Sequence, residues 1–101
     1  MMLVQMLLPL YGNDGNPLEQ QHFDRVRHEL TEKFGGLTAY TRAPAEGRWK
    51  ESGQRIHDEI VIFEVMAERL AKAWWRDYRQ ALETRFAQQV IVVRAQRVQL
   101  L

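Results

Sequence analysis

Two amphipathic helical segments, each flanked by apolar strand-like runs, constrain the fold of this chain most. In the first, apolar residues recur at spacings of three and four from Phe23 to Phe34, with charged residues on the other sides. In the second, the same spacing runs from Ala71 to Phe86. The flanking runs are apolar and include many β-branched residues, as is typical of strands. The expected strands are 3–8, 37–42, 60–66 and 90–95.

The ends of the helical segments are marked by residues that start or stop helices. Asn16 is a suitable N-cap and Pro17 a suitable first residue, and Glu19 stands where a capping-box acid is found. Gly35-Gly36 follows the first helix and allows its left-handed closure. We expect the second helix to begin near Glu68.

The resulting order, βαββαβ, predicts a ferredoxin-like α+β fold with a four-stranded antiparallel sheet and two helices on one face. The 101 residues, of which 46% are hydrophobic and 27% charged, suit one ordinary globular core. We therefore expect a single ferredoxin-like domain over residues 1–101. The stretch around Pro44, Gly47 and Gly53 breaks the strand pattern, so it is expected to form a loop.

The parity of the strands predicts which residues face the helices. Successive strand residues point to opposite faces, and the set Val61, Phe63 and Val65 is wholly apolar, so it belongs to the core. By the same test the core includes Val4, Met6, Leu8, Leu37, Ala39, Ile91, Val93 and Ala95. The open face then carries Leu3, Gln5, Leu7, Thr38, Tyr40, Arg42, Asp58, Ile60, Ile62, Glu64, Val90, Val92 and Arg94.

The centre of this open face is more apolar than a solvated sheet face normally is. An antiparallel sheet with one wet face usually alternates cleanly with polar residues, and exposed apolar patches mark interfaces. We predict a homodimer in which two sheets stack to give a dimeric α/β barrel. The alternative is a monomer with scattered surface apolar residues. The predicted interface residues are Leu7, Ile60, Ile62, Val90 and Val92.

Charged residues of the open face suggest a pocket. If Tyr40 pairs near Ile60, Arg42 comes opposite Asp58, where the two side chains can form a salt bridge. Trp49 lies outside the periodic segments, so it covers a ligand, anchors a partner, or folds back onto the core beside the second helix. The alternative for the charges is that they pair at an interface rim and fix orientation. The candidate ligand-binding residues are Tyr40, Arg42, Trp49, Asp58, Glu64 and Arg94, with Gln5 beside them.

Several other functions are disfavoured by composition. Fourteen basic and thirteen acidic residues leave a net charge of +1, which offers no general attraction for nucleic acid or an anionic membrane. The chain has no cysteine, and its three histidines form no i,i+4 pair, so a metal site is not expected. No phosphate-binding glycine loop is present, so no cofactor is expected. The lack of cysteines and of a signal or membrane-spanning segment fits the cytoplasm.

One stretch of sequence resembles a known group of proteins. The run Phe34-Gly35-Gly36-Leu37-Thr38, followed by Gly47-Arg48-Trp49 and Gly53, resembles small bacterial domains of unknown function that have Gly-Leu-Thr and then Gly-x-Trp. The resemblance implies a ferredoxin-like α+β fold.

Two functional hypotheses follow. The first is a homodimeric ligand-binding or interaction module whose partners are a second copy and a small-molecule ligand. The alternative is a cofactor-independent monooxygenase or isomerase of the dimeric α/β-barrel type, with Tyr40, Arg42, Asp58 and Glu64 around the pocket and Trp49 at its mouth. Fold analogy alone does not choose between them.

Overall fold

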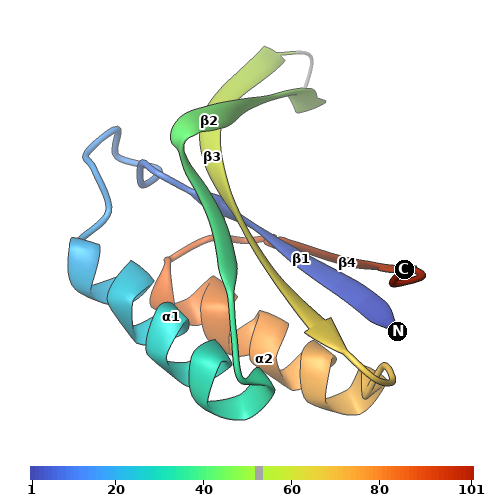
Figure 1. The fold of residues 1–101 in the computed structure, drawn as a ribbon. Coiled ribbons are helices and arrows are strands. Elements are labelled where there is room, and N and C mark those ends of the chain that lie inside the picture. Colours follow the sequence, from blue (N-terminus) through green and yellow to red (C-terminus); the bar gives the residue numbers. More distant parts are fainter. Residues whose placement is uncertain (52–53) are drawn as a thin grey trace.

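The computed structural model describes the backbone of residues 1–51 and 54–101, and within them all side chains except 42–45, 47, 49–51 and 54–58. One antiparallel sheet has the strand order β2-β3-β1-β4, and Figure 1 shows both helices against one of its faces. The predicted ferredoxin-like α+β fold is therefore confirmed. The elements are β1 (Met2–Pro9), α1 (Gln20–Phe34), β2 (Thr38–Glu51), β3 (Gln54–Ala67), α2 (Lys72–Arg85) and β4 (Val92–Arg97).

The core lies between the sheet and the helices, and the predicted strand parity is largely confirmed. Val61, Phe63 and Val65 of β3 are buried. Ala95 is exposed, although it was predicted in the core, because it lies on β4 at the edge of the sheet. The other buried apolar residues include Val4, Met6 and Leu8 of β1, Phe23, Val26 and Leu30 of α1, and Trp75, Tyr78 and Leu82 of α2.

The central strands continue beyond the core as a two-stranded arm, which corrects the predicted loop. Residues 45–51 of β2 pair with residues 54–60 of β3, and Figure 1 shows this arm extending past the other strands. Strands that pair only with each other satisfy their backbone groups without covering a core, so their sequence needs no apolar alternation. This explains why the pattern of residues 43–53 did not indicate strands.

The register of β2 on β3 also differs from the prediction. Tyr40 pairs with Ile62, not with Ile60, and Gly47 rather than Arg42 lies opposite Asp58. The register shifts between Tyr40 and Ala45, where β2 has more residues than the facing part of β3. An irregularity of this kind adds unpaired residues to one strand, and the proline in this stretch has no N–H to donate to a ladder.

The connection between β1 and α1 is a turn, so the predicted helix start at Asn16 is wrong. Asp14 Oδ1 accepts a 3.0 Å hydrogen bond from the backbone N–H of Asn16, and Tyr11 forms a β-bridge with Pro17. Aspartate commonly closes turns in this way, which competes with helix initiation. The helix begins at Gln20 instead.

The end of α1 is as predicted. Gly35 adopts a left-handed conformation with φ of 81°, and its N–H donates a 2.8 Å hydrogen bond to the carbonyl of Thr31.

The second helix and the last strand begin a few residues later than predicted. The helix α2 begins at Lys72 rather than near Glu68, and β4 begins at Val92, so Val90 precedes the strand. The backbone N–H of Ile91 donates a 2.9 Å hydrogen bond to Glu83 Oε2 of α2. Because that N–H bonds to a helix side chain, the ladder with β1 starts one residue later.

A charged cluster joins the two helices. Arg85 of α2 donates two hydrogen bonds to the carboxylate of Glu29 of α1, at 2.7 and 3.1 Å, and the Tyr78 hydroxyl donates a third at 2.9 Å. Burial of Glu29 opposes ionisation, but the bonds from Arg85 and Tyr78 outweigh it and lower the pKa of this carboxyl. Burial and the Glu29 carboxylate raise the pKa of Tyr78.

The Glu29 cluster makes stability depend on pH. The pKa of Glu29 is lower in the folded chain than its unfolded value of about 4.3. The contribution of Glu29 to the free energy of unfolding is therefore present above about pH 4.3 and is lost as the pH falls through the folded pKa. We expect Glu29→Gln to lower the unfolding free energy by about 1–2 kcal/mol at pH 7, and by less at about pH 3. Urea unfolding at both pH values measures this, with the exposed Glu32→Gln as the matched control. An equal loss at both pH values would contradict the account.

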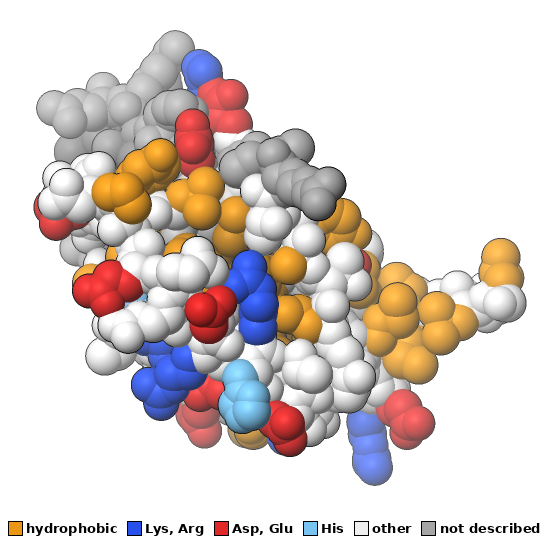
Figure 2. All heavy atoms as spheres, turned by 60° about the vertical axis from the view of Figure 1, so that its left-hand side comes forward, with side chains coloured by type: hydrophobic (Ala, Val, Ile, Leu, Met, Phe, Trp, Pro, Cys, Tyr) orange, Lys and Arg blue, Asp and Glu red, His pale blue; other side chains and the backbone are white. Residues whose placement is uncertain are grey.

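The surface on the side where α1 begins carries charges of both signs. Figure 2 shows Lys and Arg side chains interspersed with Asp and Glu on this side, together with some exposed hydrophobic side chains. Among the residues that the structure describes, no helix has the length and apolar character needed to cross a bilayer.

Candidate functional site

The sheet face opposite the helices presents side chains in rows that run across the strands. Strand pairing aligns Thr38 with Glu64, Glu64 with Gln5, and Gln5 with Arg94. We call these four residues the polar row. The next row on the same face is apolar. Strand pairing aligns Tyr40 with Ile62, Ile62 with Leu7, and Leu7 with Val92, and we call these four residues the apolar row. Leu3 lies on the other side of the polar row, between Met66 and Gln96.

The polar row is hydrogen bonded from β4 to β3. Arg94 Nε donates to Gln5 Oε1 at 2.9 Å, and Gln5 Nε2 donates to Glu64 Oε1 at 3.0 Å. The amide of Gln5 thus connects a cation on one side to a carboxylate on the other. Polar groups can be buried at an interface only if they have hydrogen-bond partners, and the Gln5 amide already has two partners within the chain.

Three large apolar residues beside the polar row are about half exposed. Tyr40 is 49% exposed, Val92 47% and Met66 47%. Leu7 and Ile62, at the centre of the apolar row, are half-buried. Burying such side chains is worth roughly 1.5–3 kcal/mol each when complete, so this face has binding energy available.

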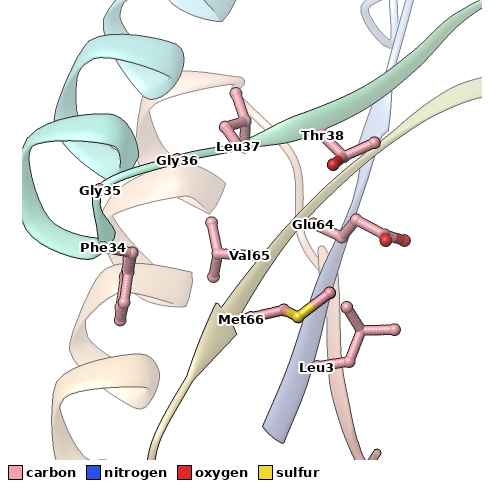
Figure 3. Close-up of a pocket in the computed structure, with 9 residues that line it drawn as sticks. All are labelled: Leu3, Phe34, Gly35, Gly36, Leu37, Thr38, Glu64, Val65 and Met66. Carbon is pink, nitrogen blue, oxygen red and sulfur yellow. The ribbon is translucent and has the colours of Figure 1, made fainter. Parts of the chain in front are cut away.

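A notch opens at the edge of the same face, where β2 leaves β3. The two strands pair only as far as Thr38 and Glu64, so the last residues of β3 have no β2 partner. The notch has a volume of about 280 Å³. Figure 3 shows Glu64 extending away from the helices and Val65 on the helix side of β3. Its lining residues are Leu3, Phe34, Gly35, Gly36, Leu37, Thr38, Glu64, Val65 and Met66.

The structure brings together part of the predicted pocket. Glu64 and Arg94 lie in the polar row, joined through Gln5, while Tyr40 lies in the apolar row two residues from Thr38. The predicted placement of Arg42 opposite Asp58 is wrong, because Gly47 lies opposite Asp58. The side chains of Arg42, Trp49 and Asp58 lie outside the described residues, so their predicted roles stay predictions.

The five predicted interface residues do not all lie together. Leu7, Ile62 and Val92 form most of the apolar row, and Ile60 is half-buried opposite Pro9. Val90 is 71% exposed in the α2–β4 connection.

Sequence reasoning missed the notch. Its walls combine the end of α1, the start of β2 and the end of β3, which are distant in the sequence. In the sequence, Gly35-Gly36 is the local feature that lies in the notch. A Cβ at either position would meet no atom within 4 Å, so the space beside both glycines is open. Among the side chains that the structure describes, no three His, Asp or Glu residues converge as metal ligands would.

Known structures resemble this chain in fold. No protein-family model matches the chain, and no curated protein matches it in sequence. The PII-like protein CutA from Nostoc sp. PCC 7120 superposes with a TM-score of 0.58 and 13% identity, over 97% of this chain and 81% of that one. CutA1 from Pyrococcus horikoshii OT3 gives 0.60 and 12%, over 100% and 86%. A phage SAM lyase in its apo state gives 0.60 and 16%, over 94% and 78%.

The chain shares the fold of these proteins. At 12–17% identity the likeness extends to the ferredoxin-like arrangement of strands and helices and not to activity. The phage lyase has also been solved in complex with S-methyl-5'-thioadenosine. Because no family model matches the chain, membership of the bacterial family suggested by the Gly-Leu-Thr motif stays a prediction.

Proposed function

We propose that this chain is an interaction module that works as a homodimer, with the open sheet faces of two copies stacked on each other. The observation that carries the proposal is the polar row, which is hydrogen bonded within the chain and has apolar side chains on both sides. Such a surface can be buried without leaving the Gln5 amide or the Glu64 carboxylate unpartnered.

The charges of the polar row favour a second copy as the partner. Glu64 and Arg94 lie on the two strands that flank β1, on opposite sides of Gln5. A two-fold axis in the plane of the interface and parallel to β1 exchanges these sides. It therefore places Glu64 of each copy over Arg94 of the other, so the row is complementary to itself.

The same axis also matches the apolar side chains. Leu7 of one copy meets Leu7 of the other, and Ile62 meets Val92. Stacked sheets are normally rotated by about 30°, which moves side chains one strand away from the axis by about 2–3 Å. Long side chains such as Arg94 and Glu64 accommodate that displacement.

The geometry leaves the edge strand β2 outside the stacked area. The partner's β4 lies over β3, and its β3 over β4, so no partner strand covers β2. Tyr40 and the notch then lie at the rim of the dimer, where a small-molecule ligand has access. The catalytic alternative is a cofactor-independent monooxygenase or isomerase with Tyr40, Arg42, Asp58 and Glu64 around a pocket and Trp49 at its mouth, and it stays a prediction from the sequence.

Sedimentation velocity of the wild-type chain tests the assembly. At about 10 μM we expect one species with twice the 12.0 kDa mass of the chain, because stacking buries the apolar rows and pairs the opposite charges of the polar rows. A single 12.0 kDa species at this concentration would refute the homodimer.

A further inference from the structure

We propose that a second cavity, on the helix side of the sheet, binds a small ligand with an apolar body and one carboxylate. The cavity has a volume of about 330 Å³ and lies between the β1–α1 connection, α1 and the middle of β2. None of its lining residues belongs to the polar or apolar row, so the inference does not rest on the proposed dimer. The lining residues are Leu10, Tyr11, Pro17, Leu18, Gln20, Phe23, Arg27, Thr41 and Val61.

The floor of the cavity is apolar. Phe23 and Val61 belong to the buried core, while Leu10 and Leu18 pack partly buried against it. Figure 2, which views the molecule from the side where α1 begins, shows exposed hydrophobic side chains next to charged ones. Ligand pockets typically have volumes from about 300 Å³ upward and combine apolar walls with a few polar groups. This cavity suits a body about the size of a phenyl ring.

Arg27 provides the charged group of the cavity. Its guanidinium lies over the ring of Phe63, 5.0 Å from the centroid, and Nη1 donates a 2.9 Å hydrogen bond to Asp24 Oδ1. Of the five N–H donors of a guanidinium, the others have no acceptor in the part of the chain that the structure describes. A guanidinium that lies over an aromatic ring, with donors that no described residue accepts from, matches a carboxylate, which accepts two parallel hydrogen bonds.

The remaining polar groups also favour an anion. The residues Tyr11 and Thr41 contribute hydroxyl groups, which can donate to a carboxylate. Glu19 and Asp24, which adjoin the lining residues Gln20 and Phe23 in the sequence, are exposed and are not part of the lining. The Asp24–Arg27 ion pair is a surface pair, worth at most about 1 kcal/mol, so it does not prevent Arg27 from binding a ligand.

Titration of the full chain with phenylacetate, 2-phenylethanol and phenethylamine, followed by amide NMR, tests the proposal. We expect phenylacetate to shift the amide signals of Tyr11, Leu18 and Thr41 at about 10 mM or below, and the neutral and cationic analogues to bind at least about tenfold more weakly. Arg27→Gln should weaken phenylacetate binding by about tenfold or more, while Arg76→Gln, an exposed change of the same charge on α2, should not.

Thr41→Val provides a second variant if Arg27→Gln does not fold, because valine suits a strand and differs from threonine only by a methyl group in place of the hydroxyl. It should weaken phenylacetate binding about two- to tenfold. The proposal is overturned by the absence of shifts around the cavity, by equal binding of the three analogues, or by equal affinities of Arg27→Gln and Arg76→Gln.

Discussion

Val92→Asp is expected to convert the proposed homodimer into a monomer. Val92 is nearly half exposed in the single chain, so a carboxylate there is solvated and the fold is retained. In the stacked dimer it faces Ile62 of the other copy, where an unpaired charge costs several kcal/mol. Because the two-fold axis repeats the substitution, the dissociation constant should rise by at least about a hundredfold. Sedimentation velocity at several concentrations measures the change.

Ala95→Asp is the matched control for this substitution. It introduces the same charge on the same strand, but Ala95 is exposed and points to the other face of the sheet. It should leave the dimer intact. If both variants dissociate equally, the charge acts through the edge of β4 and not through the open face.

Reversing either charge of the polar row should weaken the proposed dimer about as much as Val92→Asp does. Glu64→Arg places an arginine over Arg94 of the second copy, and Arg94→Glu places a glutamate over Glu64. Each substitution creates two like-charge contacts per dimer, and like charges facing each other across an interface cost several kcal/mol. We expect each variant alone to be monomeric at about 10 μM.

Arg97→Glu controls for the change in net charge that Arg94→Glu makes. Arg97 is exposed and lies on β4, with its side chain on the opposite face from Arg94. This variant should sediment as the wild type does, and circular dichroism should show that all three variants are folded.

The core and the open face were predictable because they depend on strand parity. In β3, Val61, Phe63 and Val65 alternate with Ile62 and Glu64, and a shift of one residue would expose the apolar set to solvent. The energetic cost of that error determines the register wherever one face is covered. Parity therefore places Glu64 on the open face, although it does not reveal its hydrogen bond to Gln5.

The arm of β2 and β3 was not predictable because it covers no core. Its register is set by the irregularity between Tyr40 and Ala45, and nothing in the apolar pattern indicates how many residues that irregularity takes up. Because these residues were not counted, the prediction set Arg42 opposite Asp58, whereas Gly47 lies there. The predicted pocket depended on this one register.

The two cavities were not predictable because their walls come from distant segments. Arg27 has the appearance of an ordinary exposed helix residue, and only the packing of α1 on β3 places it over Phe63. Tyr11 reaches the same cavity because Asp14 closes a turn where a helix start was expected. Neither contact leaves a signal in the local sequence.

Mixing the two charge-reversed chains tests the stacked arrangement most directly. In a heterodimer of Glu64→Arg with Arg94→Glu, each arginine faces a glutamate across the two-fold axis, so the opposite charges are restored. Sedimentation of an equimolar mixture of these separately monomeric chains should therefore show a species with twice the 12.0 kDa chain mass. A mixture that stays monomeric, or single variants that remain dimeric on their own, would contradict the account.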